Sequence, residues 1–312
     1  MNNIYNTACV TDKGLEDVVL DEIKLILNRD FEYQIINKKN KIVILCNLTD
    51  EERLKLLYLS RTIDNIYKLA KEENENILRI KIDNNEFKYK LYLLENLYDR
   101  KYEIKKIKKL KSTVVSKILL YSKIKEGETI INLQDDGSFT LEEGLILKNI
   151  PPMFFRKKEI LEYSDIFDKL ENIKNKASNI KIYCINEDQN ILNEVEKNSE
   201  KALVSNVVIF RRIDFEWIDL KFKENSIDKI YMFKIKNHEK LSKRDKYIFF
   251  HSDKLLKSGG RLYLLLYNKH EMYDKIINNI SEYIKKYRLK IIENLIIYHG
   301  GKRMCLLVIE KI

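Results

Sequence analysis

From about Lys111 to the end of the chain, apolar strand-like runs alternate with runs of helical periodicity. The runs ETIINL, NIKIYCIN, NVVIFRRI, IDKIYMFKI and RLYLLLYN are nearly continuous in apolar residues, and helical patterns lie between most of them. Strands that are apolar on both faces belong to parallel sheets that helices cover on both sides. Two closing strands around Gly300 and Gly301 indicate a terminal antiparallel hairpin. Residues 111–312 therefore predict an α/β, Rossmann-like domain.

Residues 1–98 predict a separate, small α/β domain. Residues 3–10 alternate as a strand, and residues 13–27 place apolar side chains on one helical face, with Asp12 as the expected N-cap. Lys38–Asn40 has the composition of a turn between two β-rich runs.

A second N-terminal helix is predicted over residues 49–73. Thr49 or Asp50 would cap it, and Glu52 has the spacing of a capping-box partner. Strand-like runs follow at residues 77–83 and 87–94. Further along the chain, residues 245–260 predict a helix that ends at the pair Gly259-Gly260.

A basic segment, residues 99–125, connects the two domains and includes the first helix of the second. From Arg100 to Lys125 there are ten Lys or Arg residues against one acid, in a chain of net charge +10. Such a segment is suited to phosphate contacts. A solvated helix face, with basicity that reflects codon usage, is the competing interpretation. The candidate RNA contacts are Arg100, Lys105, Lys106, Lys108, Lys109 and Lys111.

Several classes of function are not indicated. No apolar run approaches the roughly 20 residues that cross a bilayer, and the N-terminus lacks a signal-peptide layout, so a cytoplasmic protein is expected. The four cysteines and four histidines lack the spacing of a metal site or a catalytic triad. There is also no phosphate-loop sequence and no triple-glycine dinucleotide motif.

The stretch TIINLQDDGSFTLEEGLIL, residues 129–147, has the order of a nucleotide-binding strand–turn–helix unit. Its turn contains a single glycine, Gly137, and Phe139 stands where a second glycine would help. An ordinary connection between a strand and a helix is the alternative interpretation.

The whole element order resembles class I S-adenosylmethionine-dependent methyltransferases, and in particular the THUMP-containing RNA guanine-N2 methyltransferases. The resemblance rests on KGLEDVVLDEIK, LSRTIDNIYKLA, LYDRKYEIKKI, ENSIDKI and YHGGKRMCLLVI, which occur in the family order. It implies a seven-stranded sheet, S-adenosylmethionine as cofactor and tRNA or rRNA as partner. Only a couple of strands fit between Lys71 and Tyr98, so most of the THUMP module is expected to be missing.

The resemblance also implies a set of cofactor residues. In the family motif Asp-Pro-x-Cys-Gly-Ser-Gly-Thr, this chain keeps Gly137 and Ser138 but has Phe139 for the second glycine. After the second strand, Asn186 takes the place of the acid that binds the ribose, with Glu187 next to it. After the third strand, Asp214 stands where family members hold the adenine, although it could equally cap a loop. These five candidates are expected to form a vestigial or weak site: Gly137, Ser138, Asn186, Glu187 and Asp214.

The catalytic motif departs furthest from the family. Family members have Asn-Leu-Pro-Phe or Asp-Pro-Pro-Tyr, whose polar side chain and carbonyl accept hydrogens from the target amine. Here Phe233 and Ile235 take the places of the polar residue and the proline, and only Asn237 is near. No catalytic residue is therefore assigned.

Three hypotheses follow from these observations. The first is a divergent, catalytically impaired methyltransferase-like protein that binds tRNA or rRNA, with S-adenosylmethionine as its only expected cofactor, or none. The second is an active S-adenosylmethionine-dependent guanine-N2 methyltransferase. The third is a protein-interaction scaffold without an RNA role. Phe139 and the residues around Asn186 are expected to fill space that an active relative leaves open for the cofactor.

Overall fold

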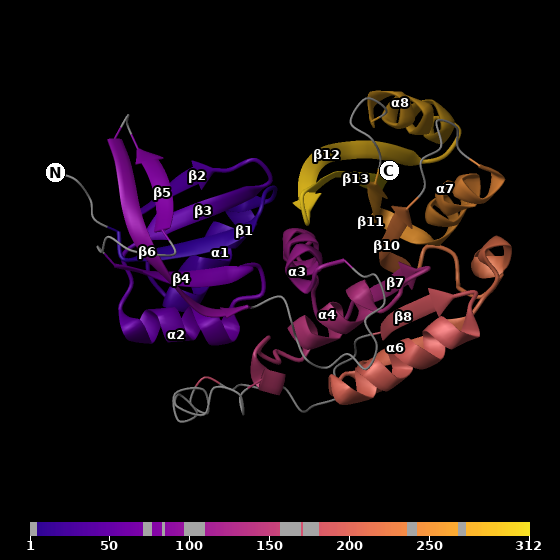
Figure 1. The fold of residues 1–312 in the computed structure, drawn as a ribbon. Coiled ribbons are helices and arrows are strands. Elements are labelled where there is room, and N and C mark those ends of the chain that lie inside the picture. The colour runs from indigo at the N-terminus through magenta and orange to yellow at the C-terminus, as the bar shows by residue number, and fades with distance from the viewer. Residues whose placement is uncertain are drawn as a thin grey trace.

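Two β-sheets dominate the computed structural model, one in each half of the chain (Figure 1). The N-terminal sheet and its two helices lie apart from the C-terminal sheet, and the helix α3 stands between them. The structure describes residues 5–70, 77–82, 85–96, 110–156, 170, 181–235, 242–267 and 273–312.

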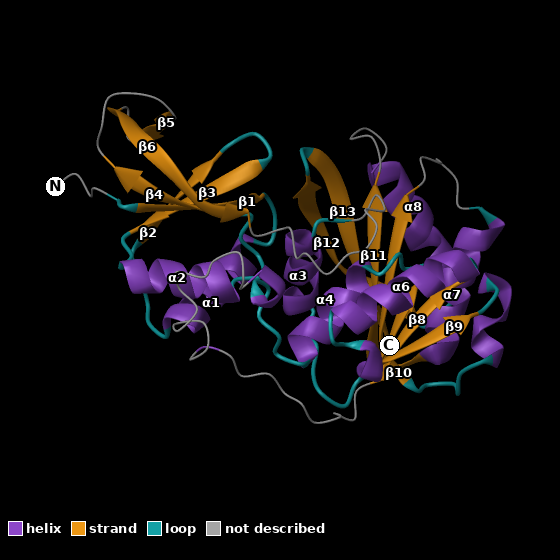
Figure 2. Ribbon diagram, turned by 60° about the horizontal axis from the view of Figure 1, so that its bottom comes forward, coloured by secondary structure: helices purple, strands orange, loops and turns teal. Residues whose placement is uncertain are grey.

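The N-terminal sheet has six antiparallel strands in the order β2-β3-β1-β4-β6-β5. Two helices, α1 (Glu16–Leu27) and α2 (Asp50–Leu59), pack on one face of it (Figure 2), where Ile23, Ile44 and Leu56 are fully buried. The hairpin predicted at Lys38–Asn40 is confirmed. The strands are β1 (Thr7–Asp12), β2 (Tyr33–Asn37), β3 (Lys41–Cys46), β4 (Asn65–Ala70), β5 (Ile77–Ile82) and β6 (Asn85–Asn96).

The two N-terminal helices begin differently. Thr49 caps α2 and forms the predicted capping box with Glu52. The prediction that Asp12 caps α1 is wrong, because Leu15 occupies that position with a left-handed backbone (φ 62°) and makes no side-chain cap bond. Asp12 is instead the last residue of β1, and its buried carboxylate faces lysine side chains.

The prediction of one helix over residues 49–73 is also wrong, since α2 ends at Leu59 and β4 follows. The buried carboxylate of Glu22 on α1 explains the break. It accepts hydrogen bonds from Ser60 Oγ (2.8 Å), from the Arg61 amide (2.8 Å), and from the amide and hydroxyl of Thr62 (3.1 and 2.6 Å). A remote side chain thus satisfies donors that a continued helix would have used internally.

The C-terminal sheet has seven strands in the order β12-β13-β11-β10-β7-β8-β9. The five strands from β11 to β9 pair in parallel, and the closing hairpin β12–β13 pairs antiparallel, as predicted for a class I methyltransferase fold. The strands are β7 (Thr129–Leu133), β8 (Lys181–Asn186), β9 (Val208–Arg212), β10 (Ile227–Ile235), β11 (Leu256–Tyr267), β12 (Leu289–His299) and β13 (Lys302–Lys311).

Helices cover both faces of this sheet. One face carries α3 (Ser112–Tyr121), α4 (Ser138–Leu147) and α6 (Gln189–Lys201), and the other carries α7 (Lys243–Leu255) and α8 (Tyr273–Ile284). Two short 3-10 helices, η2 (Ser205–Val207) and η3 (Phe215–Leu220), flank β9. The predicted end of α7 at a glycine pair is wrong, because Gly259 and Gly260 lie within β11.

Candidate functional site

The candidate cofactor residues gather at the carboxyl ends of three neighbouring parallel strands. The register pairs Leu133 of β7 with Ile185 of β8, and Asn186 of β8 with Arg212 of β9. The turns that follow these strands therefore meet along one edge of the sheet. The strand order reverses at β7, because β8 and β9 follow on one side of it and β10 and β11 on the other, and ligands of open α/β sheets bind at such a switch point.

The turn after β7 satisfies the first amides of α4 with its own carboxylates. Asp135 accepts hydrogen bonds from the amides of Phe139 (3.2 Å) and Thr140 (2.9 Å). Asp136 accepts from the amide and the hydroxyl of Ser138, at 3.1 and 2.5 Å. The N-terminus of a helix is an anion-binding position because its amides are free. Here those amides are engaged within the chain.

Burial, with a smaller contribution from neighbouring Asp136, raises the pKa of Asp135 to about 6, against the opposing effect of its hydrogen bonds to α4. The carboxyl group is therefore ionised at neutral pH and gains protons in mildly acidic solution. A negative charge at this position stabilises the helix, since it lies at the positive end of the helix dipole. The same charge disfavours a second carboxylate there.

Gly137 is required by the fold of the turn. Its φ of 92° is in the left-handed region that favours glycine. A Cβ at this position would also stand 3.2 Å from both methyl carbons of Val195 on α6, and 3.3 Å from a methyl of Leu141. The glycine thus brings α4 and α6 together, which is a structural role.

Phe139 lies in the core between α4 and the sheet. It is 3% exposed, and its ring stacks on Tyr231 of β10 with centroids 5.3 Å apart and planes 20° apart. Tyr231 in turn stacks on Tyr263 of β11 and shares a hydrogen bond of 2.6 Å with Ser122 Oγ. The ring therefore enters the core and does not stand on the outer side of the turn, so the expectation that Phe139 fills space left open for the cofactor is wrong.

The residues after β8 are bonded to the backbone around them. The side-chain amide of Asn186 donates to the carbonyl of Asp135 (3.0 Å), and its oxygen accepts from the Asp188 amide (3.0 Å). Glu187 Oε1 accepts from the Phe215 amide at 2.9 Å. These bonds tie the turn after β8 to those after β7 and β9.

Asp214 caps the 3-10 helix η3. Its carboxylate accepts from the amide of Glu216 at 3.0 Å, so its polar atoms serve the capping role that the sequence left open. The topology thus brings Gly137, Ser138, Asn186, Glu187 and Asp214 together, and each makes a defined contact within the chain.

The resemblance places the catalytic motif at the end of β10. That strand continues to Ile235, and it pairs in parallel with β11 from Lys229 to Ile235, after a register shift between Ile227 and Lys229. Phe233 packs against the apolar cluster that contains Phe139 and Tyr231. Asn237 lies outside the described residues.

Sequence reasoning missed a buried polar group beneath the turn. Asn132 of β7 donates to Glu143 Oε2 (2.8 Å) and to the hydroxyl of Thr140 (3.1 Å), both on α4. Burial raises the pKa of Glu143 to about 8. The sequence does contain an indication of this group. The Glu-Glu pair in the apolar stretch LEEGLIL places a carboxyl group on a helix face that must pack against the sheet.

Of the predicted RNA contacts, Lys111 is within the described residues, and it is engaged between the two sheets. Its ammonium group lies 3.0 Å from Asp12 and 3.2 Å from Asp64, both buried. Thr113 also donates to Asp64 at 2.6 Å. The other five, Arg100, Lys105, Lys106, Lys108 and Lys109, lie outside the described residues.

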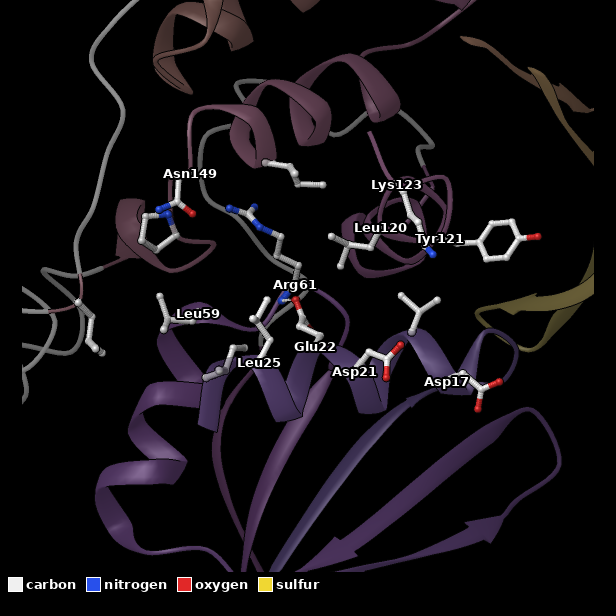
Figure 3. Close-up of a pocket in the computed structure, with 15 residues that line it drawn as sticks. Asp17, Asp21, Glu22, Leu25, Leu59, Arg61, Leu120, Tyr121, Lys123 and Asn149 are labelled. Carbon is white, nitrogen blue, oxygen red and sulfur yellow. Dashed lines mark hydrogen bonds between the residues drawn. The ribbon is translucent and has the colours of Figure 1, made fainter. Parts of the chain in front are cut away.

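A cavity of about 700 Å³ separates the two parts of the molecule. Helix α1 forms one wall and α3 contributes to the opposite wall, with Arg61 between them (Figure 3). Arg61 donates to the carbonyl groups of Ile150 and Leu145 at the end of α4, which links the two parts. Leu25 on α1 lines the cavity and is 81% exposed.

Two features are absent from the part of the chain that the structure describes. It contains no cluster of three or more His, Cys, Asp or Glu side chains arranged to hold a metal ion. Every helix in it is too short or too polar to cross a lipid bilayer.

Comparison with known proteins agrees with this architecture. A possible methylase from Clostridium difficile 630 is similar over 99% of this chain and 98% of its own, with a TM-score of 0.70 and 14% identity. SMU.472, solved in complex with SAH, gives 0.67 and 12%, covering 99% and 98%. TrmN from Thermus thermophilus gives 0.65 and 13%, covering 98% and 99%.

These identities establish the fold alone, and no curated protein matches the sequence significantly. The sequence does match the profile of the family UPF0020, described as an RMKL-like methyltransferase domain, over residues 100–292. That match covers more than half of the chain and includes β7, β10 and the candidate site between them. The protein therefore belongs to the RMKL-like methyltransferase domain family, with the class I S-adenosylmethionine-dependent methyltransferase fold.

Proposed function

We propose that this chain is a divergent RNA methyltransferase-like protein that binds tRNA or rRNA and is catalytically impaired. The observation that carries the proposal is the end of β10. Phe233 and Ile235 stand there in an unbroken strand, in place of a polar side chain and a proline-fixed carbonyl. Among the described residues, the end of β10 offers a target amine no acceptor pair to orient it, and orientation is a large part of enzymatic rate enhancement.

The geometry after β7 supports impairment at the cofactor as well. An S-adenosylmethionine carboxylate would compete with Asp135 and Asp136 for the first amides of α4. Asn186 and Glu187 hold backbone groups of neighbouring turns, and Asp214 holds the amide of Glu216 in its own turn. The residues present therefore fit this cofactor poorly, and we derive no catalytic step through it.

The partner is inferred from charge and from the family. The net charge of +10 and the basic run from Arg100 to Lys125 suit a polyanion. In the resembling RNA methyltransferases an RNA-binding module precedes the methyltransferase domain, and we infer a reduced form of that module in the N-terminal sheet. We expect tRNA or rRNA fragments to bind with an affinity that falls steeply as salt rises.

Two measurements test the proposal. Thermal unfolding with saturating S-adenosylmethionine should show little stabilisation, whereas a ligand at 100 times its Kd stabilises by about 2.7 kcal/mol. Methyl transfer to tRNA and rRNA should be negligible with radiolabelled S-adenosylmethionine. A saturable shift together with methyl transfer to guanine N2 would establish the alternative, an active guanine-N2 methyltransferase.

RNA binding is tested separately. Reversing the charges of Lys105, Lys106, Lys108 and Lys109 together should weaken binding, and each lost phosphate contact should lower the log–log salt slope by about 0.7 to 0.9. A wild-type protein that binds no RNA at moderate salt would refute the RNA role.

One observation favours a second candidate, a protein-interaction scaffold. The cavity between α1 and α3 is lined largely by apolar side chains, and Leu25 within it is strongly exposed. Exposed apolar surface of this kind is typical of protein contacts. If Leu25→Lys abolishes capture of a specific protein while RNA binding is absent from the wild type, the scaffold function takes the place of the RNA function.

A further inference from the structure

An aromatic pocket lies between α7 and α8. Both helices lie on the side of the molecule away from the N-terminal sheet (Figure 1). Its volume is about 270 Å³, and it is lined by Lys246, Tyr247, Phe250, Tyr283 and Tyr287. All four aromatic side chains are partly exposed, and Lys246 is exposed. Four partly exposed rings thus surround one small pocket.

The rings are held from below by the core. Tyr283 lies against the fully buried Phe249, with centroids 5.9 Å apart. Tyr247 stacks on the buried His251 at 5.9 Å and 18°, and His251 Nε2 is 2.8 Å from the carbonyl oxygen of Phe215. The pocket is therefore preformed, which reduces the entropy lost when a ligand binds.

The two tyrosines of the α8 side form a unit. Tyr283 and Tyr287 have centroids 5.8 Å apart, planes inclined by 56°, and hydroxyl oxygens 3.3 Å apart. Because the rings are inclined to each other, each presents a face in a different direction, and a flat ligand would stack on one ring while touching the edge of the other.

Lysine side chains lie over these rings. Lys286 Nζ is 3.9 Å from the centroid of Tyr283 and 5.2 Å from that of Tyr287, and Lys246 Nζ is 5.5 Å from Tyr283. The adjacent Lys285 and Arg288 are instead paired with Glu282 and Asp253. The cations nearest the pocket thus rest on ring faces.

A ring face with an adjacent, mobile cation is the combination that binds single-stranded nucleic acid. A base stacks on the aromatic side chain, and the cation contacts the neighbouring phosphate. An exposed cation–π contact is weaker than base–aromatic stacking, so a base can displace the lysine from the ring. The displaced ammonium group of Lys286 or Lys246 then reaches the phosphate, where its charge is worth more.

We propose that the α7–α8 pocket is a base-stacking site for single-stranded RNA. The inference deepens the proposed RNA-binding function and rests on it, but it assigns a surface separate from the turns after β7, β8 and β9. The pocket would be a second RNA contact, distinct from the basic segment of residues 99–125. Lys246 and Lys286 both lie at the pocket. Charge complementarity therefore favours a nucleic acid over an apolar peptide that has no acidic residues.

The test measures binding of a fluorescently labelled single-stranded RNA oligonucleotide by anisotropy, with the full chain. Tyr287→Leu removes the ring but keeps an apolar side chain, and it should weaken binding by roughly 5- to 100-fold, the range for losing one stacked base. Tyr287→Phe keeps the ring and should bind like the wild type. Lys286→Ala should lower the log–log salt slope by about 0.7, one phosphate contact on a single strand.

Matched controls lie elsewhere on the same domain. Trp217→Ala removes an aromatic side chain that is 56% exposed on η3, and Lys197→Ala removes an exposed charge on α6, across the sheet. Both should leave affinity unchanged. Thermal unfolding of each variant reports whether it is folded, and Lys286→Ala remains informative if the leucine variant is unstable, because an unchanged salt slope in that variant would overturn the site.

The outcomes are distinct. If the wild type binds RNA and Tyr287→Leu binds equally well, the pocket proposal is overturned while the proposed function stands. If the wild type binds no RNA, both fail together. Equal loss of binding in Trp217→Ala and Tyr287→Leu would also overturn the site. Tighter binding of a DNA oligonucleotide of the same sequence would overturn the assignment to RNA, and capture of a protein through this face would overturn the assignment to nucleic acid.

Discussion

Replacing Glu143 with glutamine should make the protein less sensitive to rising pH. The side chain is buried on α4, with Oε2 2.8 Å from the amide nitrogen of Asn132, and burial raises its pKa to about 8. The folded protein therefore keeps this carboxyl group protonated at neutral pH, whereas the unfolded chain ionises it near its usual pKa of about 4.3. Because the folded pKa is the higher one, stability is complete below the unfolded pKa and is lost as pH rises toward the folded pKa.

The magnitude follows from the separation of the two pKa values. Each unit of separation corresponds to about 1.36 kcal/mol, so between about pH 5 and about pH 7.5 this one group should lower the free energy of unfolding by about 3 kcal/mol. Glutamine has nearly the same shape, can accept the hydrogen bond from Asn132, and does not ionise. The stability of Glu143→Gln relative to wild type should therefore rise by about 3 kcal/mol between those two pH values.

Urea unfolding at the two pH values, followed by far-ultraviolet circular dichroism, measures the difference directly. Glu282→Gln is the control. Glu282 is exposed, and its hydrogen bond with Lys285 lowers its pKa, so it is ionised at both pH values and the substitution should add no pH dependence. A stability difference between Glu143→Gln and wild type that is the same at both pH values would show that the buried carboxyl group is not protonated, and the reasoning would fail.

Three further substitutions probe the frame that holds the site. Glu22→Ala leaves several buried donors without an acceptor and should lower the free energy of unfolding by about 3 kcal/mol or more in urea titrations, and a loss below about 1 kcal/mol would contradict this. Gly14→Ala should lower Tm more than Gly127→Ala. Both glycines have positive φ, but a Cβ at Gly14 would stand 2.6 Å from a carbonyl oxygen of β12, whereas a Cβ at Gly127 would face open space. Equal shifts in Tm would refute the clash. Burial raises the pKa of Asp64, but Lys111 and Lys41 together hold it below its usual value. Lys111→Met should therefore raise the pKa of Asp64 and destabilise the protein by about 2 kcal/mol. Nuclear magnetic resonance titration of the carboxyl group checks the direction, and an unchanged pKa would contradict it.

The architecture of the C-terminal half could be predicted because its apolar runs are long and its central strands, β7, β10 and β11, are buried on both faces. The same reasoning failed where a distant side chain decides the local structure. Residues 60–64 have the apolar spacing of a continued helix, but the carboxylate of Glu22 takes their donors and directs the chain into β4. Asp12 has the composition of a helix cap, but Lys41 and Lys111 draw its carboxylate into an ion cluster.

The candidate site was predictable in its location and not in its contacts. Alternation of strands and helices is enough to bring Gly137, Asn186 and Asp214 to one edge of the sheet. Whether their polar atoms face a ligand or the backbone depends on distances of about 3 Å between turns, which no periodicity encodes. Phe139 illustrates the limit: its volume was apparent from the sequence, but its direction into the core, stacked on Tyr231, was not.

The contacts of the first turn of α4 bear on whether the fold depends on a cofactor. In a binding turn, the first amides of the helix stay free for the ligand, so the empty site leaves donors that only water satisfies. Here Asp135 accepts from two of those amides, and Phe139 packs its ring beneath them against Tyr231. Each amide has one hydrogen to donate, so a bound carboxylate and Asp135 exclude each other. On the proposed function, the arrangement that stabilises the turn without a ligand is the same one that opposes methyl transfer, in keeping with the general conflict between stability and a pre-organised active site.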